Sequence, residues 1–226
     1  TGSSTERTIW NFLRCKGMSP AGAAGLMGNL YAESGLNPQN LQNSYEKRLG
    51  FTDTAYTAAV DSGAYSNFVH DSAGYGLAQW TYWSRKESLL NFARKTSASI
   101  GSLEMQLDFM IRELKGYAAV WEVLRTARTV REASDIVLTR YERPADMSSS
   151  VKAKRASFGQ AYFDAYANKS TEKEDNIMGN SPLVTYTNIT KNRTSPRNHA
   201  IDTITIHCIV GQWTAKQGCD YFATTD

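Results

Sequence analysis

Apolar residues recur along the first part of the chain at the three- and four-residue spacing of amphipathic helices. The pattern is clearest in three stretches, at 9–17, 102–116 and about 150–167, and glycines end the first two. The apolar positions expected to face a core are Ile9, Trp10, Phe12, Leu13, Leu103, Leu107, Met110, Ile111, Leu114, Val151, Phe158, Tyr162 and Tyr166. The pattern predicts a mainly α-helical domain.

Another helix is predicted from the sequence that begins at Thr129. Thr129 and Glu132 have the spacing of a capping box, and Pro144 marks the end of the helical pattern. Residues 38–83 are less regular and rich in Tyr, Ser, Thr, Gly and Asp. Long irregular segments in compact domains are usually functional, so we expect a functional loop there.

The pattern changes after residue 168. Residues 169–182 are polar, lack periodicity and contain Gly and Pro, which indicates a linker. Residues 184–190 and 203–210 are β-branched runs bounded by turn residues, and Thr214 is placed to cap a following helix. We therefore expect a helical domain at 5–168, a linker at 169–182, and the first strands and helix of an incomplete α/β domain at 183–226.

Composition and charge narrow the class of protein. With 41% hydrophobic and 21% charged residues, and no apolar run near the roughly 18 residues of a membrane span, the chain is predicted to be water-soluble. A net charge of +3 is too small to indicate nucleic acid but suits an anionic polymer such as a bacterial wall. Its three cysteines form no C-x-x-C pair, which favours a reducing compartment of synthesis over a disulfide framework. Residues 1–4 are interpreted as a remnant outside the fold, and no signal peptide is recognised.

Glu33 is the first candidate for chemistry. It falls in the last turn of a helix that Ser19 can cap and Gly35 can end, on the same face as Leu26 and Leu30. Helix-end carbonyls and apolar neighbours both disfavour a negative charge, so they favour the protonated carboxyl group that a general acid needs. The position equally allows a solvated glutamate at a frayed helix end, or one paired with an arginine.

A second signal is DSAGYGLAQWTYW at residues 71–83. Together, AESGLNP around Glu33 and GYGLAQW resemble the glutamate motif and the following glycine-leucine-glutamine motif of the goose-type lysozyme and lytic transglycosylase superfamily. The wider pattern, which includes WTYWSRKESLL, QLDFMIREL and YERPAD, resembles the lysozyme domains of phage endolysins and tail-associated lysins. The resemblance covers about residues 5–167. It implies a lysozyme-like helical fold and cleavage of the glycan strand of peptidoglycan.

The resemblance also implies site residues. Glu33 matches the catalytic acid, and Gly76, Leu77 and Gln79 match the segment that lines the sugar cleft. A glycine allows the backbone to approach a sugar ring, and the glutamine amide offers a donor and acceptors for an N-acetyl group. The aromatic residues expected to offer flat faces to sugars are Tyr75, Trp80, Tyr82 and Trp83, with plain core packing as the alternative, and Tyr141 is also expected to bind the substrate.

Glycosidases that use two carboxyl groups need a second acid, about 5–5.5 Å away for retention and about 6.5–9.5 Å away for inversion. The candidates in the irregular region are Glu46, Asp53, Asp61 and Asp71. We choose Asp71 because it lies just before the glycine motif, although an aspartate that only forms a turn is the stronger alternative. Members of this superfamily also work with a single glutamate.

Other charged residues are given structural interpretations. Glu142 lies beside Tyr141 in the YERPAD motif, and a salt-bridged helix end is its favoured role, with a place at the border of the cleft as the alternative. The basic residues within 85–95 and 152–157 are predicted to lie on solvated helix faces.

The preferred function is a muramidase that needs no cofactor and acts on bacterial peptidoglycan, without nucleic acid or membrane partners. The alternatives are a lytic transglycosylase or N-acetylglucosaminidase with the same site, a non-catalytic peptidoglycan-binding module, and a helical interaction domain. The resemblance implies synthesis in the host cytoplasm, followed by release through a holin or transport on a phage tail.

A further resemblance concerns the last part of the chain. IDTITIHCIVGQWTAKQGC resembles the first zinc-ligand strand of zinc-dependent N-acetylmuramoyl-L-alanine amidases, with His207 at the ligand position, over about residues 180–226. A catalytic zinc site needs three protein ligands, and the other two of this family would lie further downstream. Cys208 and Cys219 do not match those ligands. The expectation is a bifunctional lysin whose amidase part is incomplete here, with zinc bound only by a complete amidase domain.

We therefore expect the purified chain to bind no zinc and to release no peptides from muramyl peptides, because His207 lacks partner ligands. Elemental analysis and chromatography of digested wall fragments measure the two properties. Equimolar zinc, or release of peptides that begin with L-alanine, would contradict this and would mean that His199 or Cys219 completes the site.

Overall fold

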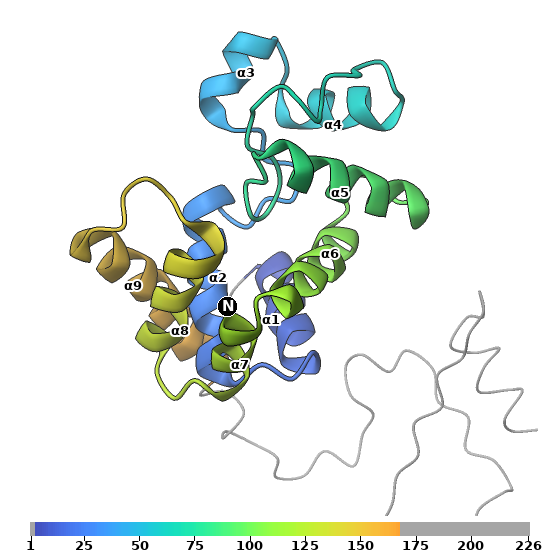
Figure 1. Cartoon of the computed structure of the whole chain (residues 1–226). Helices are drawn as coiled ribbons and strands as arrows, with labels where there is room; N and C mark the ends of the chain where they lie inside the picture. Colours follow the sequence, from blue (N-terminus) through green and yellow to red (C-terminus); the bar gives the residue numbers. More distant parts are fainter. Residues whose placement is uncertain (1–2, 168–226) are drawn as a thin grey trace, which may run out of the picture. The chain divides into compact units, whose positions relative to one another are not determined.

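One helix, α2 (Pro20–Ser34), runs through the centre of the described part of the chain (Figure 1). The computed structural model describes residues 3–167. Residues 21–30 of α2 are all buried. Ser19 caps the helix by accepting a hydrogen bond from the backbone N–H of Gly22, and Gly35 ends it in the left-handed conformation with φ 63°. The helix predicted around Glu33 is confirmed, including both ends.

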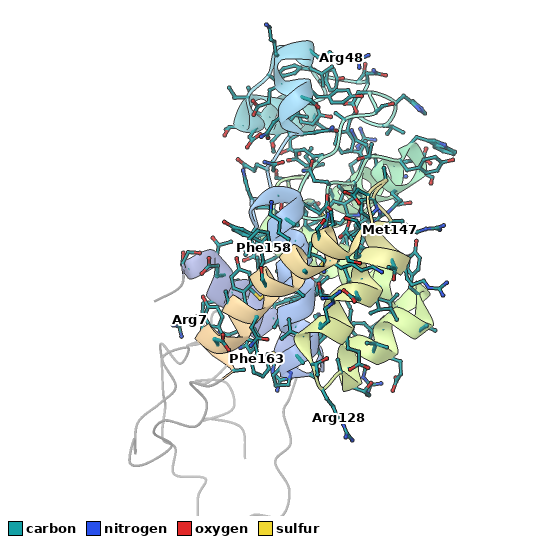
Figure 2. All side chains as sticks on the ribbon, turned by 90° about the vertical axis from the view of Figure 1, so that its left-hand side faces the viewer. Arg7, Arg48, Arg128, Met147, Phe158 and Phe163 are labelled. Carbon is teal, nitrogen blue, oxygen red and sulfur yellow. The ribbon has the colours of Figure 1, made fainter. Side chains whose placement is uncertain are left out.

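Four helices pack around α2. They are α1 (Ser4–Cys15), α7 (Ala118–Thr126), α8 (Val130–Ile136) and α9 (Ser149–Tyr166). The most extensive contact joins α2 to α9, and Figure 2 shows α9 lying across the face of α2. The core is formed by the predicted apolar stripes, including Ile9, Trp10 and Leu13 of α1 and Tyr162 of α9.

The remaining helices make up the rest of this unit, whose other end is seen at the top of Figure 1. They are α3 (Asn43–Leu49), α4 (Asp53–Asp61), α5 (Trp83–Lys95) and α6 (Leu103–Gly116). The helix α6 contacts both α5 and α7, so it connects this end to the helices around α2. The prediction of an irregular segment at 38–83 missed α3 and α4. Helices of two turns show too few apolar repeats to reveal a period, and α3 buries no residue at all.

The ends of two helices differ in detail from the predictions. Ser3 forms a full capping box with Glu6 at the start of α1, so the first residues do take part in the fold. Thr129 accepts a hydrogen bond from the backbone N–H of Glu132, as predicted. The Glu132 carboxylate, however, accepts one from the backbone N–H of Arg128, so only half of that capping box forms.

The fold class of residues 3–167 is mainly α, as predicted. Within these residues there is no strand, only isolated bridges that pair Tyr75 with Leu41 and with Trp80. None of the described helices is both long enough and apolar enough to cross a bilayer. The predicted linker at 169–182 and the strands at 184–190 and 203–210 lie outside the described residues.

The contact between α2 and α9 requires glycine on both helices. A Cβ atom added to Gly28 would lie 2.4 Å from the backbone nitrogen of Gly159 and 2.5 Å from the carbonyl oxygen of Arg155. A Cβ atom added to Gly159 would lie 2.8 Å from the carbonyl oxygen of Ala24. Because these neighbours are backbone atoms, a side chain cannot move them aside without shifting a whole helix.

We expect Gly28→Ala to destabilise the fold, because its methyl group would push α9 away from α2. Overpacking of this kind typically costs about 1–3 kcal/mol of unfolding free energy, which urea denaturation measures. The matched control is Gly116→Ala at the end of α6, where an added Cβ meets nothing within 4 Å and should be neutral or stabilising. Equal stability of the two variants would mean that the helices can separate without cost.

Candidate active site

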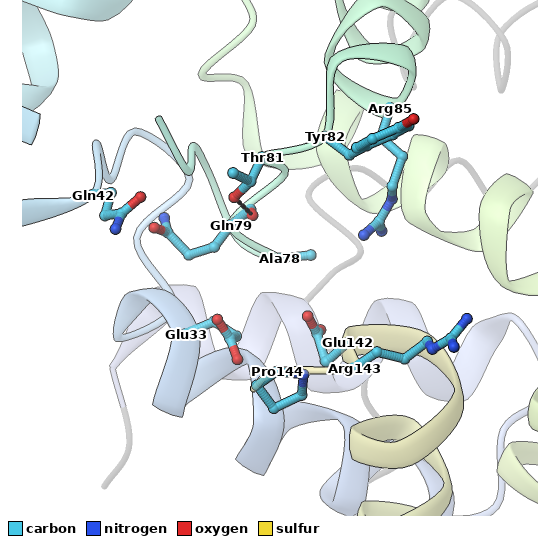
Figure 3. A pocket seen from close by; sticks show the side chains of 10 residues that line it. All are labelled: Glu33, Gln42, Ala78, Gln79, Thr81, Tyr82, Arg85, Glu142, Arg143 and Pro144. Atoms are coloured by element: carbon cyan, nitrogen blue, oxygen red, sulfur yellow. Dashed lines mark hydrogen bonds between the residues drawn. The ribbon is translucent and has the colours of Figure 1, made fainter. Parts of the chain in front are cut away.

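Glu33 lies in the wall of a cavity of about 510 Å³ between the two ends of this unit. Figure 3 shows Glu33 and Glu142 on one side, facing Ala78, Gln79 and Arg85 on the other. The Glu33 side chain is 19% exposed. The cavity is lined by Glu33, Gln42, Ala78, Gln79, Thr81, Tyr82, Arg85, Glu142, Arg143 and Pro144.

Arg155 of α9 holds the Glu33 carboxylate. Its Nη2 atom donates to Glu33 Oε1 at 2.5 Å, and its Nη1 atom donates to Asn29 Oδ1 at 3.3 Å. Asn29 is fixed in turn, because its Nδ2 atom donates to the carbonyl oxygen of Gly25 and to Ser134 Oγ. The arginine pairing that the sequence left open for Glu33 is therefore present.

The prediction that the basic residues of 152–157 are solvated is wrong for Arg155. Its relative exposure is 9%. It lies four residues after Val151 and three before Phe158, within the apolar stripe of the helix. That spacing was the signal that could have identified Arg155 as a buried residue with a charged partner.

Glu142 reaches the cavity at the end of a π-helix, η1 (Val137–Glu142). The backbone N–H of Arg143 donates to the carbonyl oxygen of Leu138 at 2.8 Å, which is the five-residue spacing of a π-turn. Arg143 then adopts the left-handed conformation with φ 51°, directly before Pro144. The wide turn and the reversal after it set the direction in which Glu142 leaves the helix.

The surroundings of Glu142 leave it without a partner. Its Oε1 atom is buried and has no hydrogen-bond partner among the described residues, in which no ion pair involves it either. The predicted salt-bridged helix end is therefore wrong. The pKa of Glu142 is raised to about 8, mainly by burial and also by the charge of Glu33, while Arg85 and Arg155 oppose the shift.

The opposite wall of the cavity depends on Glu113 of α6. Its carboxylate receives two hydrogen bonds from Arg85, each 2.9 Å long, which hold that guanidinium at the cavity. Trp80 Nε1 and the Tyr141 hydroxyl also donate to Glu113, at 2.7 and 2.8 Å. Trp80 and Tyr141 are almost completely buried, so both follow the core-packing alternative and do not line the cavity.

The glycine motif supports the cavity more than it lines it. Tyr75 is buried, with its hydroxyl 2.6 Å from that of Thr57, and Leu77 is fully buried. Gly76 has φ 74°, and a Cβ there would lie 2.6 Å from Gln106 Oε1, so glycine is needed for packing at this position. None of Tyr75, Gly76 and Leu77 lines the cavity.

Two of the predicted binding residues do reach the cavity. Gln79 has φ 44°, and its Nε2 atom donates to Asn40 Oδ1 at 2.9 Å, which fixes the amide at the cavity wall. Tyr82 is 64% exposed and presents its ring at the rim. Sequence patterns assigned no role in the cavity to other lining residues, namely Gln42, Thr81, Arg85, Arg143 and Pro144.

The cavity adjoins further hollows. One of about 470 Å³ shares Glu33, Gln42 and Gln79 with it, so Glu33 lies where the two meet. Another of about 870 Å³ shares Arg143 and is bordered by the exposed side chains of Tyr117 and Met147.

Asp71, predicted as the second carboxyl group, does not line the cavity. Its side chain is 1% exposed and pairs with Lys86, whose side chain is fully buried, over 2.5 Å. The hydroxyls of Tyr56 and Tyr65 also donate to Asp71. Its Oδ1 atom accepts from the backbone N–H of Ala73, which is the turn-forming role given as the alternative.

Lys86 corrects a second prediction, that the basic residues of 85–95 are solvated. Burial lowers the pKa of Lys86, and the hydrogen bond to Asp71 opposes that shift. Lys86 also donates to the carbonyl oxygen of Ala73 at 2.8 Å and lies 4.4 Å from the centre of the Phe68 ring. Asp71 and Lys86 therefore form a buried structural pair that joins α5 to the glycine motif.

The described residues offer no candidate site for a metal ion. Among residues 3–167, no group of three or more His, Cys, Asp and Glu side chains is arranged to hold one. His207, the residue predicted as a zinc ligand of a complete amidase domain, lies outside these residues.

Comparison with known proteins gives two findings. The profile of the phage tail lysozyme family matches residues 4–166, well over half of the 226-residue chain. Morphogenesis protein 1 of Bacillus phage B103 is 24% identical over 159 residues, which cover 66% of this chain and 36% of that protein. The chain therefore matches little more than a third of the length of this relative.

We expect Asp71→Asn to destabilise the fold, because it leaves the Lys86 ammonium group buried without a counter-charge. Breaking a buried pair on one side typically costs about 3–5 kcal/mol of unfolding free energy, which thermal or urea denaturation measures. The double variant Asp71→Asn/Lys86→Met should recover part of this loss. A stable but inactive Asp71→Asn would instead support the catalytic role predicted from the sequence.

Proposed function

Because this chain belongs to the phage tail lysozyme family, we propose that it cleaves the glycan strand of bacterial peptidoglycan, with Glu33 as the general acid. The observation that carries this proposal is the place of Glu33, in the wall where two hollows meet. A polymer that occupies both hollows would put one of its internal bonds beside this carboxyl group. Cleavage within a chain requires such an arrangement.

The lining of the cavity suits an amino sugar. Gln42 and Gln79 offer amide donors and acceptors, and Thr81 offers a hydroxyl group, which match the N-acetyl and hydroxyl groups of such a polymer. The exposed ring of Tyr82 gives one face of a pyranose ring a flat apolar surface. Arg85 and Arg143 add positive charge, which suits the lactyl carboxylate or peptide carboxylates of muramic acid residues.

In the proposed reaction, Glu33 gives a proton to the glycosidic oxygen as the bond to the anomeric carbon breaks. Water then adds to that carbon and leaves a new reducing end. We favour a muramidase, which leaves muramic acid at this end. A lytic transglycosylase would instead leave a 1,6-anhydro ring, and an N-acetylglucosaminidase would leave glucosamine at the reducing end.

One observation favours a second candidate, a peptidoglycan-binding module without activity. Glu33 is ion-paired with Arg155, so its carboxyl group already serves as the partner of a buried cation. Under this alternative the cavity would hold the glycan without cleaving it.

The same proposal extends to the wider protein. We infer a lysin that reaches the wall with a phage tail or after release from the host, and that is related to goose-type lysozymes. Its residues 183–226 would begin a zinc amidase domain. The name of the phage relative, a morphogenesis protein, is compatible with a protein carried by the phage particle.

We expect Glu33→Gln to reduce glycan cleavage by at least about 100-fold, because a general acid contributes a factor of this size or more. The fold should persist, with a loss of no more than about 2 kcal/mol in unfolding free energy, since the amide oxygen can still accept from Arg155. The matched control is Glu87→Gln on the exposed side of α5, which should keep full activity.

Release of new sugar ends from purified walls measures activity, and mass spectrometry of the fragments identifies the bond and the product. Reducing muramic acid ends are expected. Anhydro ends would identify the chain as a lytic transglycosylase instead, and reducing glucosamine ends would identify it as an N-acetylglucosaminidase. Wall binding by the unaltered chain without any new sugar ends would support the binding module.

A further inference from the structure

Two carboxyl groups line one cavity in opposite surroundings. Glu33 Oε1 accepts a hydrogen bond from Arg155 at 2.5 Å, whereas Glu142 Oε1 is buried and has no partner in the described part of the chain. Figure 3 shows both side chains on the same side of the cavity, each directed into it. Glu142 is therefore the carboxyl group of this cavity whose charge is least compensated.

The two arginines whose charges act on Glu142 are already paired with other groups. From α9, Arg155 binds Glu33, and from α5, Arg85 binds Glu113 of α6 through two hydrogen bonds of 2.9 Å. The charged groups that face Glu142 are thus two arginines with partners of their own and two further carboxylates. An ionised Glu142 would add a third negative charge and bury one of its oxygens without a donor, which is costly.

Protonation of Glu142 avoids both the third negative charge and the buried anionic oxygen without a donor. The neutral carboxyl group has no charge to be repelled by Glu33, and it can donate a hydrogen bond within the cavity. Burial is the main reason why the pKa of Glu142 is raised to about 8, with Glu33 and Glu113 adding to the shift and Arg85 and Arg155 opposing it. When two neighbouring carboxyl groups are held in such different environments, one serves as the proton holder and the other as the anion.

We propose that Glu142 is the second carboxyl group of the active site and holds the proton that Glu33 delivers. This inference rests on the proposed glycosidase function and answers the difficulty raised by the ion pair between Glu33 and Arg155. In the free protein Glu142 holds the proton and Glu33 is paired with Arg155. With a glycan in the cavity, the proton passes from Glu142 to Glu33 and from there to the glycosidic oxygen.

The protons and bonds balance over one turnover. The leaving oxygen takes the proton as the glycosidic C–O bond breaks, and both carboxyl groups are then ionised. Their negative charge stabilises the positive charge that develops at the anomeric carbon. The hydroxyl group of the attacking water bonds to that carbon, and the remaining proton of the water returns to the pair of glutamates.

The pH dependence of activity should follow the proton on Glu142. Glu142 holds its proton below a pH of about 8 and loses it above, so activity should fall as the pH rises through that value. In Glu142→Gln the proton reservoir is absent, and Glu33 must take its proton from solvent against the pull of Arg155. This variant should lose at least 90% of the activity at neutral pH and have its optimum shifted to acid pH. Glu87→Gln should keep the profile of the unaltered chain.

A stability measurement tests the proton without any activity. Glu142 has a pKa of about 8 in the folded protein and an ordinary value of 4.5. The folded state therefore holds an extra proton between these values, so the stability of the unaltered chain should fall with rising pH relative to Glu142→Gln. The unfolding midpoint of the unaltered chain minus that of the variant should decrease between about pH 4.5 and about pH 8 and stay constant above.

The deciding experiment is a ¹³C NMR titration of the glutamate carboxyl carbons in the full chain, in which Glu142→Gln assigns the Glu142 signal. That signal should titrate near pH 8, and Glu33→Gln should move it to lower pH by removing a neighbouring negative charge. Titration of Glu142 in the ordinary carboxylate range, or a Glu142→Gln variant with an unaltered pH profile, overturns the proposal.

These outcomes separate this inference from the proposed function. An inactive Glu33→Gln beside a fully active Glu142→Gln would leave Glu33 as the general acid and remove Glu142 from the mechanism. If the unaltered chain released no sugar ends at any pH, the glycosidase function and this mechanism would both be wrong. The titration would still show in that case whether Glu142 holds a proton.

Discussion

The direct contact between the backbones of α2 and α9 is the constraint on which the rest of the site depends. Gly28 and Gly159 face one another with no room for a side chain on either helix. This close approach brings Arg155 within reach of Asn29 and Glu33, which follow Gly28 on the facing helix. A larger residue at the crossing would separate the helices. The Glu33 carboxylate would then lose its ion pair with Arg155, although no residue of the cavity had been substituted.

The charged groups of this domain differ in whether a partner compensates their charge. Lys86 is buried with Asp71, and Arg85 is bound to Glu113, so the ion pairs around the cavity are satisfied by geometry that the fold provides. Glu142 departs from this rule, with a buried oxygen that has no donor in the described residues. An unpartnered buried oxygen is rare in folded proteins, and this one belongs to a residue that lines the same cavity as Glu33.

The glycine motif acts mainly by fixing the backbone that carries a residue of the cavity wall. Tyr75 and Leu77 are core residues, and Gly76 is needed because Gln106 packs against it. Their effect is to fix the turn in which Gln79 has a positive φ and points its amide toward the cavity. Residues in a sequence motif therefore need not line a cavity, because a motif also preserves the backbone that positions one or two lining side chains.

Local order in the sequence determined the longer helices and the place of Glu33 on α2, because caps and helical periods involve residues only a few positions apart. The short helices α3 and α4 were not predicted, since two turns contain too few repeats. Only the tertiary structure decided the partners of the charged residues. Arg155 is 122 positions from Glu33, and the packing of separate elements turned Asp71 into a structural residue and brought Glu142 into the cavity. A carboxyl group is chemically the same at any position in a sequence, and its burial and the charges around it, which exist only in the fold, decide whether it holds a proton.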